Sequence, residues 1–213
     1  MPEVYISDEV ADVINLYSSI EPTSNVHSLL FKKSKTLLAG HQSKHPGSAV
    51  EITSWFPALV GESAYEIFNT NFELEDAQLT VSRIHGFSNW AEVENSPLEL
   101  QQEFEKAVDY LLNGNVSVLQ NLLIEYPYLA KSHSQFPHQA TLLHYCASNG
   151  IETERQVVPN NLLELVDLLL DLGSDKQSTM KVYNGSYTAH DLASTSAHPQ
   201  GAGLTTALCK KLK

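Results

Sequence analysis

The strongest hydrophobic pattern in the chain lies between residues 160 and 173. Its apolar positions follow the spacing of one helical face: Leu162, Leu165, Val166, Leu169 and Leu172. Residues at i, i+3, i+4 and i+7 share one face of an α-helix, and Gly173 stands where a helix commonly ends. Further leucines fall outside this face: Leu163, Leu168 and Leu170. We therefore predict an interior helix, begun by Asn160 or Asn161, that is covered on more than one side.

Three segments share one layout, in which a helix, a tight turn and a second helix precede an extended connection. They span residues 104–126, 141–173 and 188–213. In the first two, glycines stand where helices are expected to end: Gly114, Gly150 and Gly173. Glycine at a helix end adopts the left-handed conformation at little cost. A layout repeated in this way is typical of a helical solenoid.

The second and third segments carry the motif of a known repeat family. TLLHYCA at 141–147 and TAHDLA at 188–193 resemble the ankyrin-repeat signature Thr-Pro-Leu-His-x-Ala. The two threonines are 47 residues apart, whereas the ankyrin period is about 33 residues, which implies an insertion of about 14. We place the insertion at IETERQVVPNN, residues 151–161.

Both segments depart from the ankyrin signature at particular positions. The second has Leu142 at the Pro position and Cys146 at the Ala position. The third replaces Pro, Leu and His with Ala189, His190 and Asp191. The ankyrin resemblance implies a structural role for the signature histidine, whose ring would bond backbone groups of neighbouring turns. That role passes to His144 alone.

The N-terminal part predicts helices over residues 7–19 and 73–85. Residues 37–40 parallel residues 111–114 and indicate a degenerate helical pair. DAQLTVSRIHGFSNW at 76–90, together with the ERQVVPNN and SAHPQGAG loops, resembles a bacterial ankyrin-like group of unassigned activity. This resemblance extends from about residue 24 to the end. We predict an all-α helical solenoid of ankyrin-like repeats with an N-terminal helical cap. The cap and the degenerate pair occupy residues 1–96, continuous with about three repeats in residues 97–213.

Composition narrows the choice of partner and location. The net charge is -12, which opposes binding to a nucleic-acid backbone. The N-terminus has acidic residues in place of the basic start of a secretory signal, and the apolar runs are too short to span a membrane. Cys146 and Cys209 are too few for a disulfide framework. We expect a cytoplasmic protein that has neither cofactor nor membrane partner.

The nine histidines raise the question of a metal site. His41 and His45 have the i, i+4 spacing that brings two ligands to one helical face. Gly40 before them and Pro46 after them favour a loop instead, and a neighbouring glutamate that would complete a zinc-protease motif is missing. We predict no metal site and assign no catalytic residue.

The insertion at residues 151–161 is the candidate functional region, because a solenoid needs only a tight turn there. The candidate binding residues come from the insertion and from nearby histidines: Glu152, Glu154, Arg155, Gln156, Asn160, His138 and His198. Arg155 either contacts a ligand or pairs with a neighbouring acid and braces SAHPQGAG, residues 196–203. Both interpretations stay open.

A stacked repeat array displays surfaces and turns without supplying a prearranged catalytic group. We therefore expect an ankyrin-type protein interaction module, whose partner is a basic or neutral protein. The alternative is a small-molecule or metal-dependent enzyme that uses the 151–161 insertion with His138 and His198. That alternative needs a pocket in which these groups converge.

Overall fold

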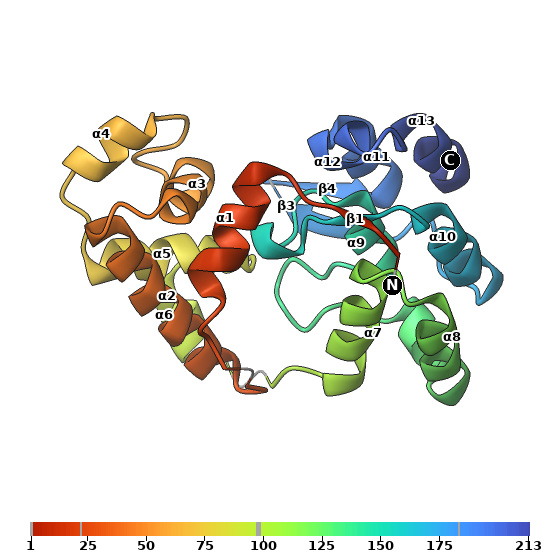
Figure 1. The fold of residues 1–213 in the computed structure, drawn as a ribbon. Coiled ribbons are helices and arrows are strands. Elements are labelled where there is room, and N and C mark those ends of the chain that lie inside the picture. Colours follow the sequence, from red (N-terminus) through yellow and green to blue (C-terminus); the bar gives the residue numbers. More distant parts are fainter. Residues whose placement is uncertain (1, 22, 97–98, 183) are drawn as a thin grey trace. The chain divides into compact units, whose positions relative to one another are not determined.

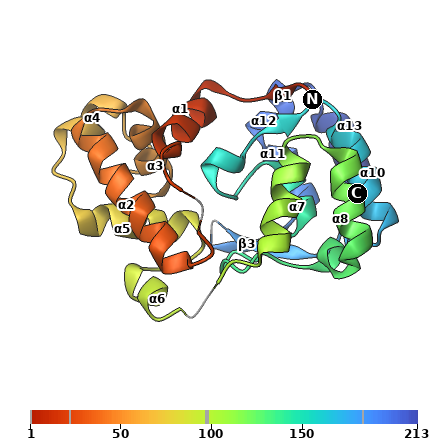
Figure 2. The same ribbon diagram turned by 60° about the horizontal axis from the view of Figure 1, so that its bottom comes forward.

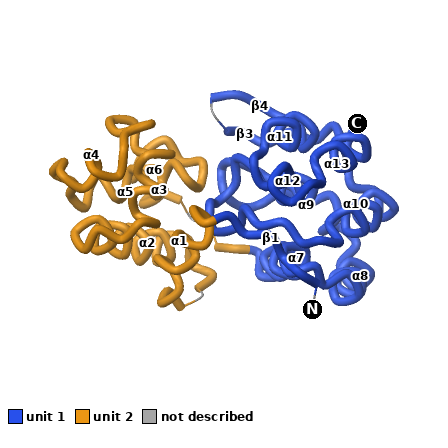
Figure 3. Tube along the Cα trace, turned by 45° about the horizontal axis from the view of Figure 1, so that its top comes forward, with its two compact units in different colours: residues 1–7, 101–213 blue, residues 8–100 orange. Residues whose placement is uncertain are grey.

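The computed structural model describes residues 2–21, 23–96, 99–182 and 184–213, and it is mostly helical (Figure 1). The chain forms two compact units (Figure 3). Residues 8–100 form unit 2, and residues 101–213 form unit 1 together with residues 1–7. The predicted predominance of helix is confirmed.

Unit 2 contains six helices within its described residues: α1 (Asp8–Tyr17), α2 (Val26–Gln42), α3 (Pro46–Trp55), α4 (Ala64–Asn69), α5 (Leu74–Ile84) and α6 (Trp90–Glu94). Helix α1 packs on α3, and α2 packs on α5. The predicted helices at residues 7–19 and 73–85 are confirmed as α1 and α5. Gly47 lies against the backbone of Asp12, so a side chain there would collide with α1. Glycine therefore permits the close packing of α1 on α3.

The loop predicted at His41 and His45 is wrong in its first half. Helix α2 continues through Gly40 and His41 to Gln42. A side chain at Gly40 would approach Leu16 to 2.6 Å, so this glycine permits close helix packing. His45 caps α3, and its Nδ1 accepts a hydrogen bond of 3.1 Å from the Gly47 amide. The positions of Gly40 and Pro46 favoured a loop, but the helix continues because the face of α2 that carries Gly40 is buried against its neighbours.

Unit 1 contains the three predicted segments (Figure 2). The first consists of α7 (Gln102–Leu112), α8 (Val116–Glu125) and the 3-10 helix η1 (Pro127–Lys131), and the second of α9 (Leu142–Ala147) and α10 (Leu162–Asp171). The third consists of α11 (Ala189–Thr195), α12 (Ala197–Gly201) and α13 (Thr205–Leu212). Gly114 and Gly173 have φ angles of 71° and 86° and follow the ends of α7 and α10, as predicted. Gly150 was predicted to end α9, but that helix ends at Ala147, and Ser148 takes the left-handed position with a φ angle of 49°. Helix α9 packs against α7, α10 and α11.

The predicted interior helix is α10, and it is buried on one face only. Its stripe of Leu162, Leu165, Val166 and Leu169 is at most 1% exposed. The other leucines, Leu163, Leu168, Leu170 and Leu172, are half-buried. The prediction of cover on several sides is therefore too strong, because neighbouring side chains shield these leucines only in part.

Short strands in unit 1 were not predicted. Strand β1 (Val4–Tyr5) pairs antiparallel with β2 (Val158–Pro159), and β3 (Thr179–Val182) pairs antiparallel with β4 (Gly185–Thr188). The first pairing attaches the N-terminal residues to the insertion. The second forms a hairpin whose Lys181 amide donates a 2.8 Å bond to the His138 carbonyl. The two-residue strands β1 and β2 are too short to show the alternating pattern that identifies strands in a sequence. Strand β3 does alternate, with Met180 and Val182 buried, but over only four residues.

Candidate functional site

The inserted segment, residues 151–161, is part of the packed interior of unit 1. It contains the 3-10 helix η2 (Thr153–Arg155) and strand β2. Its buried residues are Ile151, Glu152, Thr153, Val157, Val158 and Pro159. The insertion therefore has packing contacts that the repeat layout alone does not require.

A buried carboxylate, Glu152, lies at the centre of the candidate site. Glu152 as a whole residue is 1% exposed. The Tyr145 hydroxyl donates to its Oε2 at 3.3 Å. Arg155 Nη1 and His138 Nε2 lie 3.6 and 3.7 Å from its Oε1. Two of the predicted site residues, His138 and Arg155, therefore meet Glu152 in the interior.

Arg155 connects this carboxylate to the first segment. Its Nη2 lies 2.5 Å from Glu105 Oε2 on α7, and its guanidinium carbon lies 5.7 Å from the centre of the Tyr145 ring. The Arg155 and Glu105 side chains are only 21% and 15% exposed. We call Glu105, His138, Tyr145, Glu152 and Arg155 the buried cluster.

The electrostatics of the buried cluster favour a charged Arg155. Burial disfavours its charge, but Glu105 and Glu152 more than offset that cost and raise its pKa above the ordinary value. Burial, followed by the charge of Glu152, raises the pKa of Tyr145. Tyr145 therefore stays protonated and able to donate to Glu152. The cluster is therefore an internal network of opposite charges and hydrogen bonds, in which His138 Nε2 approaches Glu152 Oε1 only to 3.7 Å.

The other predicted site residues lie outside the buried cluster and contact different partners. Gln156 Oε1 bonds His198 Nε2 at 2.9 Å, and Gln156 Nε2 donates to the Ile151 carbonyl at 2.8 Å. The backbone N–H of Asn160 donates a 2.8 Å hydrogen bond to the Glu3 carbonyl beside β1. Glu154 is half-buried. Gln156 therefore braces residues 196–203, whereas Arg155 pairs with an acid of α7.

The signature histidine, His144, bonds in two directions. The Thr141 amide donates to its Nδ1 at 3.1 Å, so Nε2 carries the proton of the neutral ring. Nε2 then donates to the Tyr187 carbonyl of β4 at 3.1 Å. Burial lowers the pKa of His144 from 6.5 to about 4. This geometry agrees with the structural role that the resemblance implied.

Sequence reasoning missed Tyr145 and Glu105 as members of the buried cluster. Tyr145 occupies the variable position of the signature, for which the motif specifies no residue type and no role. A buried tyrosine hydroxyl usually needs a polar partner, which was the available signal. Glu105 follows Phe104 on an amphipathic helix, and nothing in that local pattern points to Arg155.

The described residues give further limits on chemistry. Within them, no group of three or more His, Cys, Asp or Glu side chains is placed to hold a metal ion. A surface hollow lies beside β4 and α11 and is lined by Ser186, Tyr187, Asp191, Leu192, Ser194 and Thr195. None of the predicted binding residues lines it. No helix among the described residues combines the length and apolar character required to cross a membrane.

The comparisons with known proteins identify no relative. No family model matches the sequence, and no significant match was found to a curated protein or a solved structure.

Proposed function

We propose that the chain is a protein interaction module of ankyrin type. The observation that carries this proposal is a set of three exposed apolar side chains on the second helix of the first segment, α8, and on the 3-10 helix η1 that follows it. Val118, Ile124 and Tyr128 are 43%, 62% and 51% exposed. Helix α8 packs on α7 and α10 with its other face, where Leu119 and Leu123 are at most 1% exposed.

Exposed apolar side chains on two consecutive elements, here α8 and η1, favour a protein contact site when polar residues surround them. Ser117, Gln120, Asn121 and Glu125 are the exposed polar residues of α8. The ring of Tyr128 also contacts that of Tyr126, with centres 6.2 Å apart. Tyrosine supplies a large contact area at a low entropy cost, which makes Tyr128 a suitable anchor.

The layout of unit 1 supports the ankyrin type. Thr141 and Thr188 each precede a short helix and each bond the residue three positions later. His144 bonds the hairpin before α11, as the family role predicts. The enzyme alternative gains no support, because the His138 and Glu152 side chains are each only 2% exposed and His198 bonds Gln156.

A photocrosslinking experiment tests this proposal. A crosslinking amino acid at Ile124 should capture a partner in source cells, and the same group at Val60, which is 59% exposed in unit 2, is the matched control. The captured protein is then purified, and its affinity for the parent chain is compared with that for Ile124→Glu. We expect Ile124→Glu to lower the affinity at least about tenfold, because burying the glutamate charge in the interface costs about 1.4 kcal/mol or more. Equal affinity of the purified partner for both chains would refute this surface.

A further inference from the structure

Unit 2 carries a separate surface cluster of aromatic rings. His27 and Phe31 lie one turn apart on α2 and stack with ring centres 6.2 Å apart. Trp90 of α6 lies 5.7 Å from the His27 ring and 6.4 Å from the Phe31 ring. His27 and Phe31 are exposed and Trp90 is half-buried. We call these three residues the aromatic patch.

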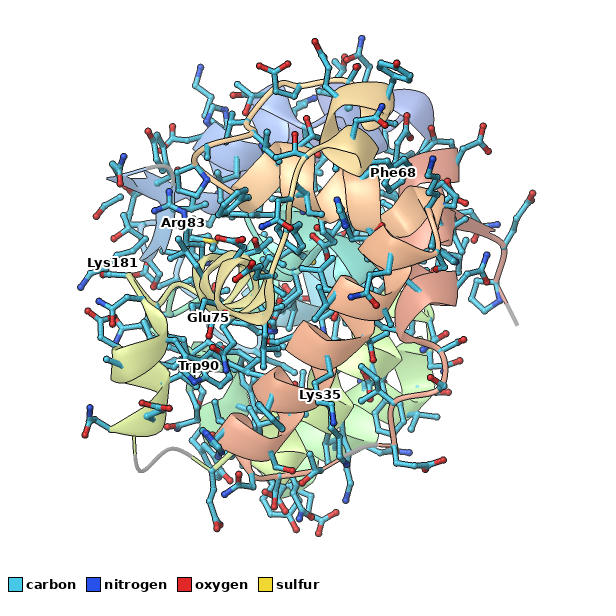
Figure 4. All side chains as sticks on the ribbon, turned by 90° about the vertical axis from the view of Figure 1, so that its left-hand side faces the viewer. Lys35, Phe68, Glu75, Arg83, Trp90 and Lys181 are labelled. Atoms are coloured by element: carbon cyan, nitrogen blue, oxygen red, sulfur yellow. The ribbon has the colours of Figure 1, made fainter. Side chains whose placement is uncertain are left out.

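Charged residues of opposite sign flank the aromatic patch on its two helices. Lys35 continues the α2 stripe, and its Nζ lies 5.7 Å from the centre of the Phe31 ring. Glu94 on α6 accepts a 3.1 Å hydrogen bond from Trp90 Nε1. Lys32 and Glu92 are further exposed charges on the same two helices. The patch therefore has a basic flank from α2 and an acidic flank from α6, and Figure 4 shows Lys35 and Trp90 on one face of the unit.

This charge arrangement narrows the choice of occupant. Residues 8–100 contain 13 Asp and Glu but only five Lys and Arg, so the unit as a whole repels a phosphate backbone. An occupant must instead supply an acid opposite Lys35, a base opposite Glu94 and an apolar centre between them. The same patch on a second copy, turned about a two-fold axis, supplies all three features.

We propose that the aromatic patch mediates self-association of this chain. In a two-fold interface the same surface serves both copies, so a patch with opposite charges on its two sides complements itself. The rings stack at the centre, where water is excluded, and each basic flank meets the acidic flank of the other copy. This interaction is independent of the partner surface proposed on α8.

The size of the patch implies a weak, reversible dimer. A stable interface buries about 800 Å² on each partner, and three partly exposed aromatic rings supply less than this. The net charge of -12 also opposes close approach of two copies. We expect a dissociation constant on the order of 10 to 100 µM, in the range of small transient interfaces.

Sedimentation of the full chain tests the proposal. Concentrations from about 5 to 500 µM cover the expected dissociation constant. The parent should shift from monomer to dimer, and Phe31→Glu should weaken association at least about tenfold. Tyr65→Glu is the matched control, because Tyr65 is 79% exposed on α4 of the same unit and lies outside the patch. Its dimerisation should equal that of the parent.

A charge exchange tests the proposed two-fold arrangement. Lys35→Glu and Glu94→Lys should each weaken the dimer several-fold, because each places like charges across the axis. The double variant restores opposite charges and should recover most of the parental affinity. In a Trp55→Phe background, Trp90 fluorescence should shift to shorter wavelength as concentration rises.

Three outcomes would overturn self-association at this patch. The first is a parent that stays monomeric up to 500 µM. The second is a dimer that Phe31→Glu leaves intact, and the third is a double charge variant no tighter than the two single variants. Circular dichroism and melting temperature establish that each variant is folded. A failure here leaves the Ile124 experiment unaffected.

Discussion

The second and third segments of unit 1 begin with the same turn, but they use it differently. In the second, His144 accepts from the amide of Thr141 and donates to the Tyr187 carbonyl of the hairpin. In the third, Asp191 Oδ2 accepts bonds of 2.9 and 2.8 Å from the Thr188 amide and hydroxyl. His144 is 1% exposed, whereas the Asp191 side chain is 53% exposed.

The difference shows what histidine adds to a helix cap. A neutral imidazole both accepts and donates, so one side chain completes its own turn and bonds a neighbouring one. An ionised carboxylate only accepts, so Asp191 completes its own turn and retains most of its hydration. Arg155 of the second segment also donates a hydrogen bond to Glu105 on α7, in the preceding segment. The second segment is therefore connected on both sides, and predictions that exchange or remove these groups test this comparison.

The largest effect is expected from exchanging the two capping residues. His144→Asp buries a carboxylate and leaves the Tyr187 carbonyl without its donor, so unfolding free energy should fall by about 3 to 5 kcal/mol. Asp191→His, the matched exchange at the exposed cap, should cost under about 1 kcal/mol. Urea denaturation at pH 7 measures both. Equal losses would show that the turns have equivalent roles.

Removing the ion pair between Arg155 and Glu105 should have the next largest effect on the free energy of unfolding. Arg155→Met removes the positive charge between Glu105 and Glu152 while keeping most of the side-chain volume. We expect a loss of about 2 to 3 kcal/mol in the free energy of unfolding, reduced from the value for a fully buried pair because Arg155 is partly exposed. Lys211→Met is the control, because its pair with Asp167 is exposed and should contribute at most about 1 kcal/mol. A loss at Arg155 no greater than at Lys211 would contradict the structural importance of the buried cluster.

The smallest of these effects concerns pH. The folded pKa of His144, about 4, lies below the unfolded value of 6.5. The unfolded chain therefore binds a proton first as pH falls, and stability decreases between pH 6.5 and 4. From pH 7 to pH 5 this one group should cost about 2 kcal/mol.

His144→Asn isolates that contribution in urea denaturation at pH 7 and pH 5. Its amide oxygen and nitrogen can replace the two hydrogen bonds without titrating. The pH-dependent loss in this variant should therefore be smaller than in the parent by about 2 kcal/mol. An unchanged pH dependence would show that His144 is not the titrating group. The Asp191 carboxyl has a lowered pKa because of its bonds to Thr188, so its contribution is lost only at more acidic pH.

Sequence patterns identified the helices better than the contacts between them. The spacing of Leu162, Leu165, Val166 and Leu169 located α10, because a helix that buries one face must repeat apolar residues at that interval. The Thr141 motif located α9 and indicated the role of His144. The same reasoning failed at Gly40, where glycine permits packing inside a helix and does not end it. It also overstated the burial of α10, since periodicity does not show how many neighbours a helix has.

For the candidate site residues too, the sequence indicated their positions in the chain but not most of their contacts. The insertion at residues 151–161 was recognised because it interrupts the repeat spacing, and two of its residues were placed beside His138 or His198 by folding. The network through Tyr145 and Glu105 was not predicted. Glu105 and Arg155 are 50 residues apart, and a charge on a polar helix face has no local feature that identifies its partner.

The sequence by itself determined the helical segments, the helix ends at Gly114 and Gly173 and the site of the insertion, because each depends on spacing and backbone preference within a few residues. Tertiary structure decided that the insertion packs inward, that β1 joins β2 and that Glu152 lies between Arg155, Tyr145 and His138. These outcomes depend on which distant groups share a space closed to water. Burial makes an unpaired charge costly, and only the complete fold provides its partner.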